Sequence, residues 1–122
     1  ALVSLTRGEG FGLPLLEAAA SGLPVIATNW SGHLDFLNKG KFIKVGYSLQ
    51  EVHKTRIDGR IFLPGMKWAE PVEIDAKARL RKFYNSNAMP KKWAKELSTV
   101  LQEEYSQEAI CKRYNEVFNG LI

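Results

Sequence analysis

Two glutamates and three glycines gather near the start of the chain, in residues 8–17. Gly8, Gly10 and Gly12 surround Glu9, and Glu17 follows eight residues after Glu9. Glycines allow the backbone to approach a ligand closely and to adopt positive φ angles. A helix directly after such a loop offers free N–H groups and the positive end of its dipole, which together suit an anion such as phosphate. Corners of this kind also occur for packing reasons alone, so the glycine pattern leaves both interpretations open.

The two carboxylates favour a ligand. Glu17 lies in an otherwise apolar stretch, residues 15–20, where an unpaired buried carboxylate would be costly. It either complements the dipole at the start of a helix or accepts hydrogen bonds from ligand hydroxyls. Glu9 is either a solvated loop charge or a second acceptor. Two acceptors beside an anion site suit a ligand with both phosphates and hydroxyls, and a nucleotide sugar has both.

Three further residues have chemistry to consider. Arg7, next to the glycines, either pairs with a phosphate or is a solvated loop side chain. His33 either contacts phosphate or sugar, or is a surface or hydrogen-bonded histidine. Cys111 is the single cysteine, which excludes an intramolecular disulfide and fits a reducing compartment, so we expect a cytoplasmic protein. The sequence has neither an Asp-x-Asp motif nor a His/Cys cluster, which are common patterns of metal ligands.

The elements that would position these residues follow a strand–helix–strand pattern. Residues 1–5 are apolar and predict a buried strand, and residues 25–28 predict a second, parallel one. Between them, Pro14 suits a first helical turn and Gly22 suits the position after the last. Because the helix interior is apolar on nearly every side, we expect it to be buried all round. A helical turn over residues 33–38 and a third strand over residues 42–47 follow.

The second half of the chain predicts mostly helix. The Asp-Gly pair at residues 58–59, flanked by apolar residues, predicts a tight hairpin. Three apolar stripes of helical period then close the chain, with Asp75 capping the first helix, Pro90 opening the second and Ser106 capping the third. The predicted fold class is therefore α/β: a short parallel sheet with flanking helices in three layers, a partial Rossmann-like domain.

Length and charge limit the remaining options. The 122 residues make one domain, without an apolar run long enough to span a bilayer, and the net charge is +4. The exposed faces of the last two predicted helices carry several cations, which are either a solvated face or a contact with an anionic membrane. These cations are Lys91, Lys92, Lys95, Lys112 and Arg113. We expect no nucleic-acid binding, because no recognised fold or aromatic platform accompanies the charge.

The residues from Ser4 to Phe36 resemble a known family. The sequence Glu-Gly-Phe-Gly-Leu-Pro-Leu-Leu-Glu at residues 9–17 is similar to the Glu-x7-Glu signature of retaining GT-B glycosyltransferases of the group 1 class. Residues 30–35 resemble the Gly-Gly loop that follows in the family, and Trp-Ala-Glu-Pro at residues 68–71 resembles a later segment of some members. The resemblance implies a transferase that uses a nucleotide-diphosphate sugar and no metal.

The resemblance also implies a role for each matched residue. Glu9 would contact hydroxyls of the donor sugar and is the implied catalytic residue, and Glu17 would bind the ribose hydroxyls. Gly10, Phe11, Gly12 and Leu13 would form the loop whose backbone N–H groups lie against the sugar and the diphosphate. Two positions depart from the family's pattern: Ser31 replaces the first glycine of the pair, and Asp35 is shorter than the usual acid.

Because the chain begins at Ala1 within an apolar strand, we expect it to be a fragment, half of the C-terminal GT-B domain of a longer protein. It would then lack the N-terminal acceptor domain and be inactive alone, and its uncovered apolar stripes would favour self-association. Two other functions stay open. One is a catalytically silent nucleotide-sugar sensor or interaction module, and the other is a basic protein-interaction domain whose glycines only turn the chain.

Overall fold

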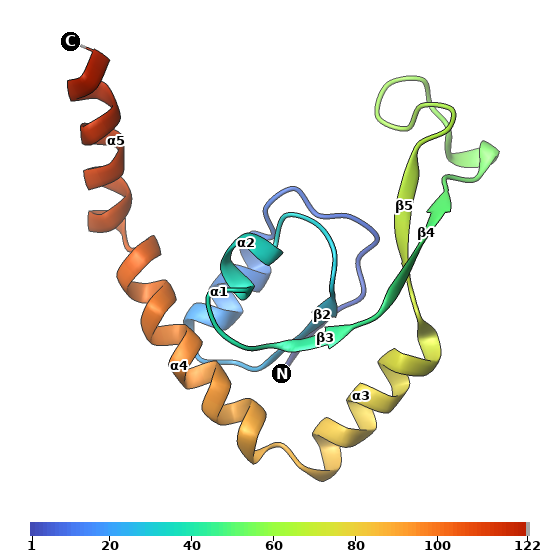
Figure 1. Ribbon diagram of the computed structural model, residues 1–122, viewed down its shortest axis with the longest axis horizontal. Helices are drawn as coiled ribbons and strands as arrows, with labels where there is room; N and C mark the ends of the chain where they lie inside the picture. The colour runs from blue at the N-terminus through green and yellow to red at the C-terminus, as the bar shows by residue number, and fades with distance from the viewer. Residues whose placement is uncertain (122) are drawn as a thin grey trace.

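The computed structural model describes residues 1–121 and is built around a three-stranded parallel sheet (Figure 1). The strands are β1 (Leu2–Ser4), β2 (Val25–Thr28) and β3 (Ile43–Val45), in the order β1-β2-β3, and both pairs are parallel. The predicted strand–helix–strand unit is therefore confirmed. β1 is an edge strand of the sheet and β2 is central. Because the two strands are parallel, their carboxyl ends lie at the same edge of the sheet.

Helices cover both faces of this sheet, which confirms the three-layer α/β fold. In β2, Val25 and Ala27 point to one face and Ile26 to the other, and all three are buried. The first face packs on α1 (Leu13–Ala20) and α4 (Ala88–Tyr105). The short helix α2 (Leu34–Leu37) completes this layer.

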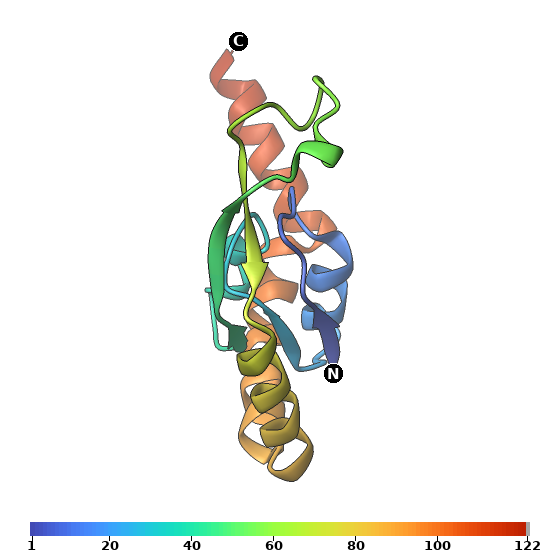
Figure 2. The ribbon, with the colours of Figure 1, turned by 90° about the vertical axis from the view of Figure 1, so that its right-hand side faces the viewer.

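The second face of the sheet packs on α3 (Glu73–Asn85). Ala76 of this helix lies against Ile26 and Val45, and Phe83 packs at the border of the same cluster. Figure 2 shows α3 and α4 continuing below the sheet, with the turn between them at the end of the molecule.

The segment after β3 differs most from the sequence prediction. The third strand ends at Val45, not at residue 47, and the chain continues through Gly46 into β4 (Tyr47–Glu51), which pairs antiparallel with β5 (Lys67–Pro71). The two strands form a ribbon that projects away from the sheet (Figure 1). The prediction of a tight hairpin at the Asp-Gly pair is therefore wrong: the hairpin strands are β4 and β5, and residues 52–66, which include the 3-10 turn η1 (Lys54–Arg56), connect them.

The Asp-Gly pair makes a local loop within that connection. Oδ1 of Asp58 accepts hydrogen bonds from the backbone N–H groups of Arg60, Ile61 and Phe62, and Gly59 has a φ of 72°. These hydrogen bonds lower the pKa of the Asp58 carboxyl. The pair therefore reverses the chain, as a turn signal should, but no strands flank it directly.

The helix after the glycine loop is only partly buried, which corrects the expectation of a fully buried helix. Leu15 and Ala19 lie in the core, whereas Glu17 is exposed and Leu13 is 60% exposed. The apolar sequence of this helix thus serves one buried face and leaves the other, with Glu17, open.

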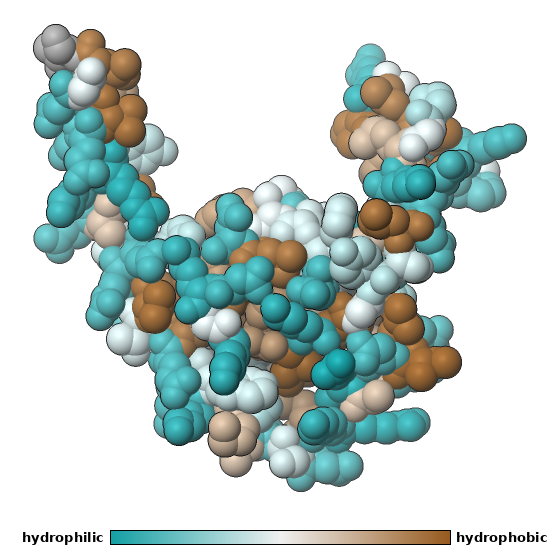
Figure 3. All heavy atoms as spheres, in the orientation of Figure 1, coloured by the Kyte–Doolittle hydropathy of each residue, from teal (hydrophilic) through white to brown (hydrophobic). Residues whose placement is uncertain are grey.

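The last helix, α5 (Gln107–Leu121), carries an uncovered apolar stripe. The hydroxyl of Ser106 accepts a hydrogen bond from the N–H of Ala109, which confirms the predicted cap. Hydrophobic side chains gather along one side of α5, as Figure 3 shows, and all are more than half exposed: Tyr114, Val117, Phe118 and Leu121. Self-association through this stripe stays a prediction. Within residues 1–121, no helix combines the length and the apolar character that crossing a membrane requires.

Asp75 joins the sheet to α3 and is not the helix cap that the sequence predicts. The helix begins at Glu73, and the carboxylate of Asp75 accepts a 2.7 Å hydrogen bond from the N–H of Gly46 and a 3.0 Å bond from Arg79. The backbone bond from Gly46, followed by the bond from Arg79, lowers the pKa of Asp75 below its ordinary 3.8. The side chain therefore fixes the point where the chain leaves the sheet for the ribbon.

An Asp75→Asn variant is expected to be less stable than the unmodified chain at neutral pH, and this difference should shrink in acid. Because the pKa is lower in the folded state, the charged form stabilises the fold above the unfolded pKa, and this contribution is lost as the pH falls through the folded pKa. Denaturant unfolding between pH 7 and pH values below about 4 measures the difference. A Glu73→Gln variant, which removes only the exposed pair with Lys77, should show a smaller difference; equal pH profiles would contradict the role of Asp75.

Candidate functional site

The glycine loop connects β1 to α1, and Gly12 is its most constrained residue. Gly12 has a φ of 87° and occupies the N-cap position of α1, where no side chain caps the helix. A Cβ added there would lie 3.1 Å from Cγ of Glu9 and 3.2 Å from Cβ of His33. Glycine is required for both reasons, the backbone conformation and the space. The predicted residues Glu9, Gly12 and His33 therefore meet at the start of this helix.

The loop after β2 packs directly on the glycine loop through Ser31. Its hydroxyl accepts a 2.8 Å hydrogen bond from the N–H of Glu9 and donates a 2.7 Å bond to the carbonyl of the same residue. Ser31 has a φ of 90°, a conformation that favours glycine. The departure from the Gly-Gly pattern is thus explained: two hydrogen bonds offset a backbone strain of about 1–3 kcal/mol and fix the backbone of Glu9.

Gly32, the next residue, is in closer contact with the glycine loop than any side chain would allow. Its N–H donates a 3.0 Å hydrogen bond to the carbonyl of Glu9, and a Cβ at this position would lie 1.7 Å from the carbonyl oxygen of Gly10. The glycine loop and the loop after β2 therefore pack backbone against backbone at the carboxyl ends of β1 and β2, and together they form a two-loop layer. Sequence reasoning did not single out Gly32, although its place in the family's Gly-Gly pair was the signal for it.

His33 is fully buried beneath Gly12, which shows that it is not a surface histidine. Its Nε2 lies 2.7 Å from the carbonyl oxygen of Thr28, so the proton must be on Nε2 for this hydrogen bond to form. Among residues 1–121, Nδ1 of His33 and Oγ1 of Thr28 are both buried without a hydrogen-bond partner. The buried ring thus packs beneath the glycine loop and holds it in place. A contact of His33 with phosphate or sugar stays a prediction.

Arg7 is not a free loop side chain. Its guanidinium makes two hydrogen bonds to the carboxylate of Glu70 on β5, Nη2 to Oε1 at 2.9 Å and Nε to Oε2, and it stacks 4.8 Å above the ring of Trp68. The ion pair raises the pKa of Arg7 and lowers that of Glu70. The carbonyl of Arg7 also accepts a bond from the N–H of Ala69. Arg7 therefore fastens the ribbon to the glycine loop, and its contact with phosphate stays a prediction.

A cavity of about 570 Å³ lies where the ribbon meets the carboxyl ends of β1 and β2. In open α/β sheets this edge is where ligands bind. Trp30 and Trp68 line the cavity from two different elements, and Lys67 adds a cation. The full lining is Leu5, Thr6, Arg7, Gly8, Trp30, Phe62, Lys67 and Trp68. Sequence reasoning missed the contribution of the ribbon, for which the Trp-Ala-Glu-Pro segment at residues 68–71 was the available signal.

The two predicted glutamates differ in their surroundings. Glu9 is partly buried in the layer between the loops, and Glu17 is exposed on the second turn of α1. Neither lines the cavity that reaches Gly8. Their convergence on one ligand therefore stays a prediction.

Of the other predicted loop residues, Phe11 packs on the core and Leu13 is exposed. The ring of Phe11 lies 5.3 Å from that of Phe36 and 6.2 Å from that of Tyr105, so it anchors the loop on the core. Leu13 is largely exposed at the start of α1. A Cβ on Gly10 would meet no atom within 4 Å, and the carbonyl of Gly10 is the one that Gly32 approaches. The described residues include no group of three or more His, Cys, Asp or Glu side chains that could hold a metal ion.

Comparisons with known proteins place this site in context. Residues 1–58 match the family model of glycosyl transferases group 1. A segment of 32 residues is 56% identical to a sucrose synthase of Melioribacter roseus. These matches support the group 1 glycosyltransferase family. The 32 residues are 26% of this chain and 4% of that relative, so the chain spans a small part of its length. No solved structure matches the chain.

The region similar to group 1 glycosyltransferases contains all of the predicted site residues. It runs from β1 into the connection of the ribbon, and thus includes both loops that meet at Glu9. β5 and the three closing helices lie outside the matched residues. The partner of Arg7 therefore comes from a part of the chain that the family model does not match.

Proposed function

We propose that this chain supplies part of the donor site of a retaining GT-B glycosyltransferase that uses a nucleotide-diphosphate sugar. The observation that carries the proposal is the two-loop layer at the start of α1, which lies within the residues similar to group 1 glycosyltransferases. Gly12 leaves this end of the helix without a side-chain cap, so its N–H groups are available to a diphosphate. The sucrose synthase match supports glycosyl transfer in general terms.

Each predicted residue has a role in this proposal. Glu9, held by Ser31, accepts hydrogen bonds from hydroxyls of the donor sugar and is the catalytic candidate. Glu17, exposed on α1, accepts hydrogen bonds from the ribose hydroxyls. The backbone from Gly10 to Leu13 lies against the sugar and the diphosphate. Electrostatic stabilisation of the leaving diphosphate then needs no metal ion.

The proposal includes a second domain and a cellular location. An N-terminal acceptor domain would complete the cleft, so we expect the present chain to be inactive by itself. We place the complete protein in the cytoplasm, with one face available for a membrane contact.

The test is a Glu17→Ala substitution in the intact protein. Because a carboxylate that accepts two hydroxyl donors contributes charge-assisted hydrogen bonds, we expect donor affinity to fall about 10- to 100-fold while the fold is unchanged. Isothermal titration with UDP- and GDP-sugars measures the affinity, and a transfer assay measures the rate. Glu103→Ala, an exposed acid on α4, is the matched control.

Three results would each contradict part of this proposal. Unchanged donor affinity and transfer rate in Glu17→Ala would remove Glu17 from the donor site. Donor binding without transfer or hydrolysis in the intact protein would instead favour the catalytically silent nucleotide-sugar module. No affinity for any nucleotide would favour a protein-interaction domain.

A further inference from the structure

Positive charge is concentrated in one short part of the chain. Residues 76–95 contain seven of the 17 lysine and arginine residues and none of the 13 acidic residues. The rest of the chain consequently has more acids than cations, although the net charge of the whole is +4. The seven cations are Lys77, Arg79, Arg81, Lys82, Lys91, Lys92 and Lys95. All seven are exposed. Lys77 and Arg79 pair with Glu73 and Asp75, and the other five have no ion-pair partner among residues 1–121, so this stretch has a positive surface.

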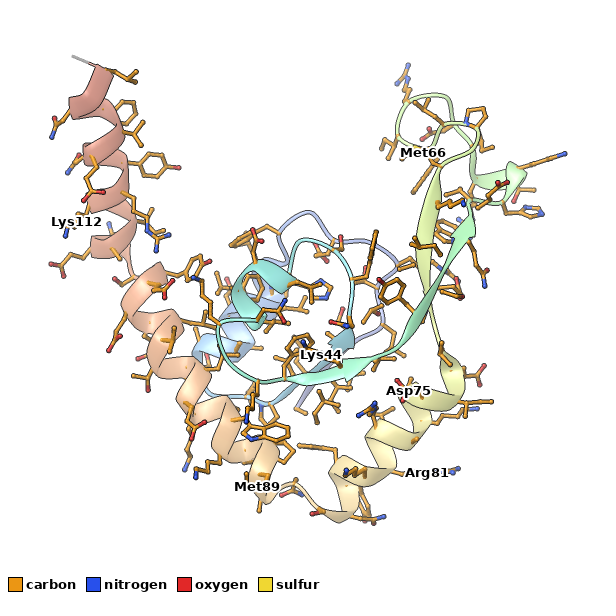
Figure 4. The ribbon with its side chains drawn as sticks, viewed as in Figure 1. Lys44, Met66, Asp75, Arg81, Met89 and Lys112 are labelled. Carbon is orange, nitrogen blue, oxygen red and sulfur yellow. The ribbon has the colours of Figure 1, made fainter. Side chains whose placement is uncertain are left out.

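These residues form a corner of the molecule, where α3 turns into α4. Large side chains are exposed on both sides of this turn: Tyr84, near the end of α3, is 85% exposed, and Met89, near the start of α4, is 55% exposed. Figure 4 shows Met89 at the turn and Arg81 on α3 pointing away from the sheet. An exposed apolar tip with cations on both sides suits the boundary between lipid headgroups and acyl chains. Nucleic acid would also be attracted by the charge, but one exposed tyrosine beside a methionine is not a platform on which successive bases could stack.

A cavity of about 600 Å³ opens at the same corner, between β3, α3 and α4. Lys44 and Lys82 line it, and neither belongs to an ion pair among residues 1–121. Ser86 contributes a hydroxyl, while Trp93 and Met89 provide an apolar wall. Two unpaired ammonium groups and a hydroxyl beside an apolar wall are complementary to a lipid phosphate and the glycerol and upper acyl chain attached to it.

We propose that the α3–α4 corner docks on an anionic phospholipid surface, with Tyr84 and Met89 entering the headgroup region and the cavity at Lys44 and Lys82 taking a lipid phosphate. In Figure 1 this corner lies below the sheet, whereas the glycine loop lies above it. A docked protein would keep that loop open to the solution, where a water-soluble ligand reaches it. The inference deepens the membrane contact included in the proposed function, but it rests on the surface of the corner and not on glycosyl transfer.

Vesicle co-sedimentation of the intact protein tests this. We expect binding to phosphatidylglycerol-containing vesicles, little binding to pure phosphatidylcholine vesicles, and weaker binding as salt is raised. Because a cation near an anionic surface contributes about fivefold in affinity, the double variant Lys44→Gln/Lys82→Gln should bind about 30-fold more weakly. Met89→Ser should weaken binding at high salt, where the apolar contact dominates.

The matched control is Lys54→Gln/Lys112→Gln, which removes the same charge from η1 in the ribbon connection and from α5. Figure 4 shows Lys112 on α5, away from the corner. It should bind almost as well as the unmodified protein. Equal losses in the two double variants would mean that only net charge matters and would overturn the proposal. Equal binding to phosphatidylcholine alone would also overturn it. So would binding of a DNA or RNA oligonucleotide that requires Lys44 and Lys82 while vesicles are not bound.

Discussion

A Gly32→Ala variant is expected to lose about 3–5 kcal/mol of unfolding free energy and all measurable donor binding. The added Cβ would lie 1.7 Å from the carbonyl oxygen of Gly10, 2.6 Å from its carbonyl carbon and 2.9 Å from the carbonyl oxygen of Glu9. All three are backbone atoms, so no side-chain rotation relieves the overlap. The two loops must separate, which breaks the hydrogen bonds that Gly32 and Ser31 make to Glu9.

The matched control for this variant is Gly8→Ala. Gly8 lies in the same glycine loop, but no atom lies within 4 Å of its Cβ position, so the variant should stay within about 1 kcal/mol of the unmodified chain. Urea unfolding gives both free energies, and titration with a nucleotide-diphosphate sugar in the intact protein gives the affinities. Equal stability of the two variants would show that the loops are not packed as described.

A His33→Ala variant should show the second large effect, a loss of about 3 kcal/mol of unfolding free energy. The substitution removes a fully buried ring and leaves the carbonyl of Thr28 without its 2.7 Å hydrogen bond. Because His33 directly follows Gly32, whose N–H binds the carbonyl of Glu9, the cavity left by the ring should also loosen the contact between the two loops at the start of α1. Donor affinity should therefore fall together with stability.

His33→Gln separates the hydrogen bond from the volume, because its amide can donate to the carbonyl of Thr28. We expect this variant to recover part of the lost stability. His53→Ala is the matched control: this exposed histidine caps only the short turn η1 through Thr55, so its loss should change the free energy by no more than about 1 kcal/mol. If His33→Ala is as stable as His53→Ala, then His33 does not support the loop.

The sequence by itself determined the parts of this protein that depend on neighbours in the chain. The apolar runs at β1 and β2 predict strands, Pro14 marks the start of α1, and Ser106 caps α5, because each signal acts within a few residues. The glycine loop with Glu9 was located for the same reason, and the residues around it carried the resemblance to group 1 glycosyltransferases. The parallel pairing followed from the strand–helix–strand order.

Only the tertiary structure decided what the residues of the site contact. Arg7 pairs with Glu70, 63 residues away, and Ser31 binds the backbone of Glu9, 22 residues away. Asp75 resembles a helix cap in sequence but binds Gly46, because a carboxylate takes whichever donor the folded chain brings near. The ribbon was missed for a similar reason: the pairing of β4 with β5 closes a long connection, and its hydrogen bonds leave no periodic pattern in the sequence between them.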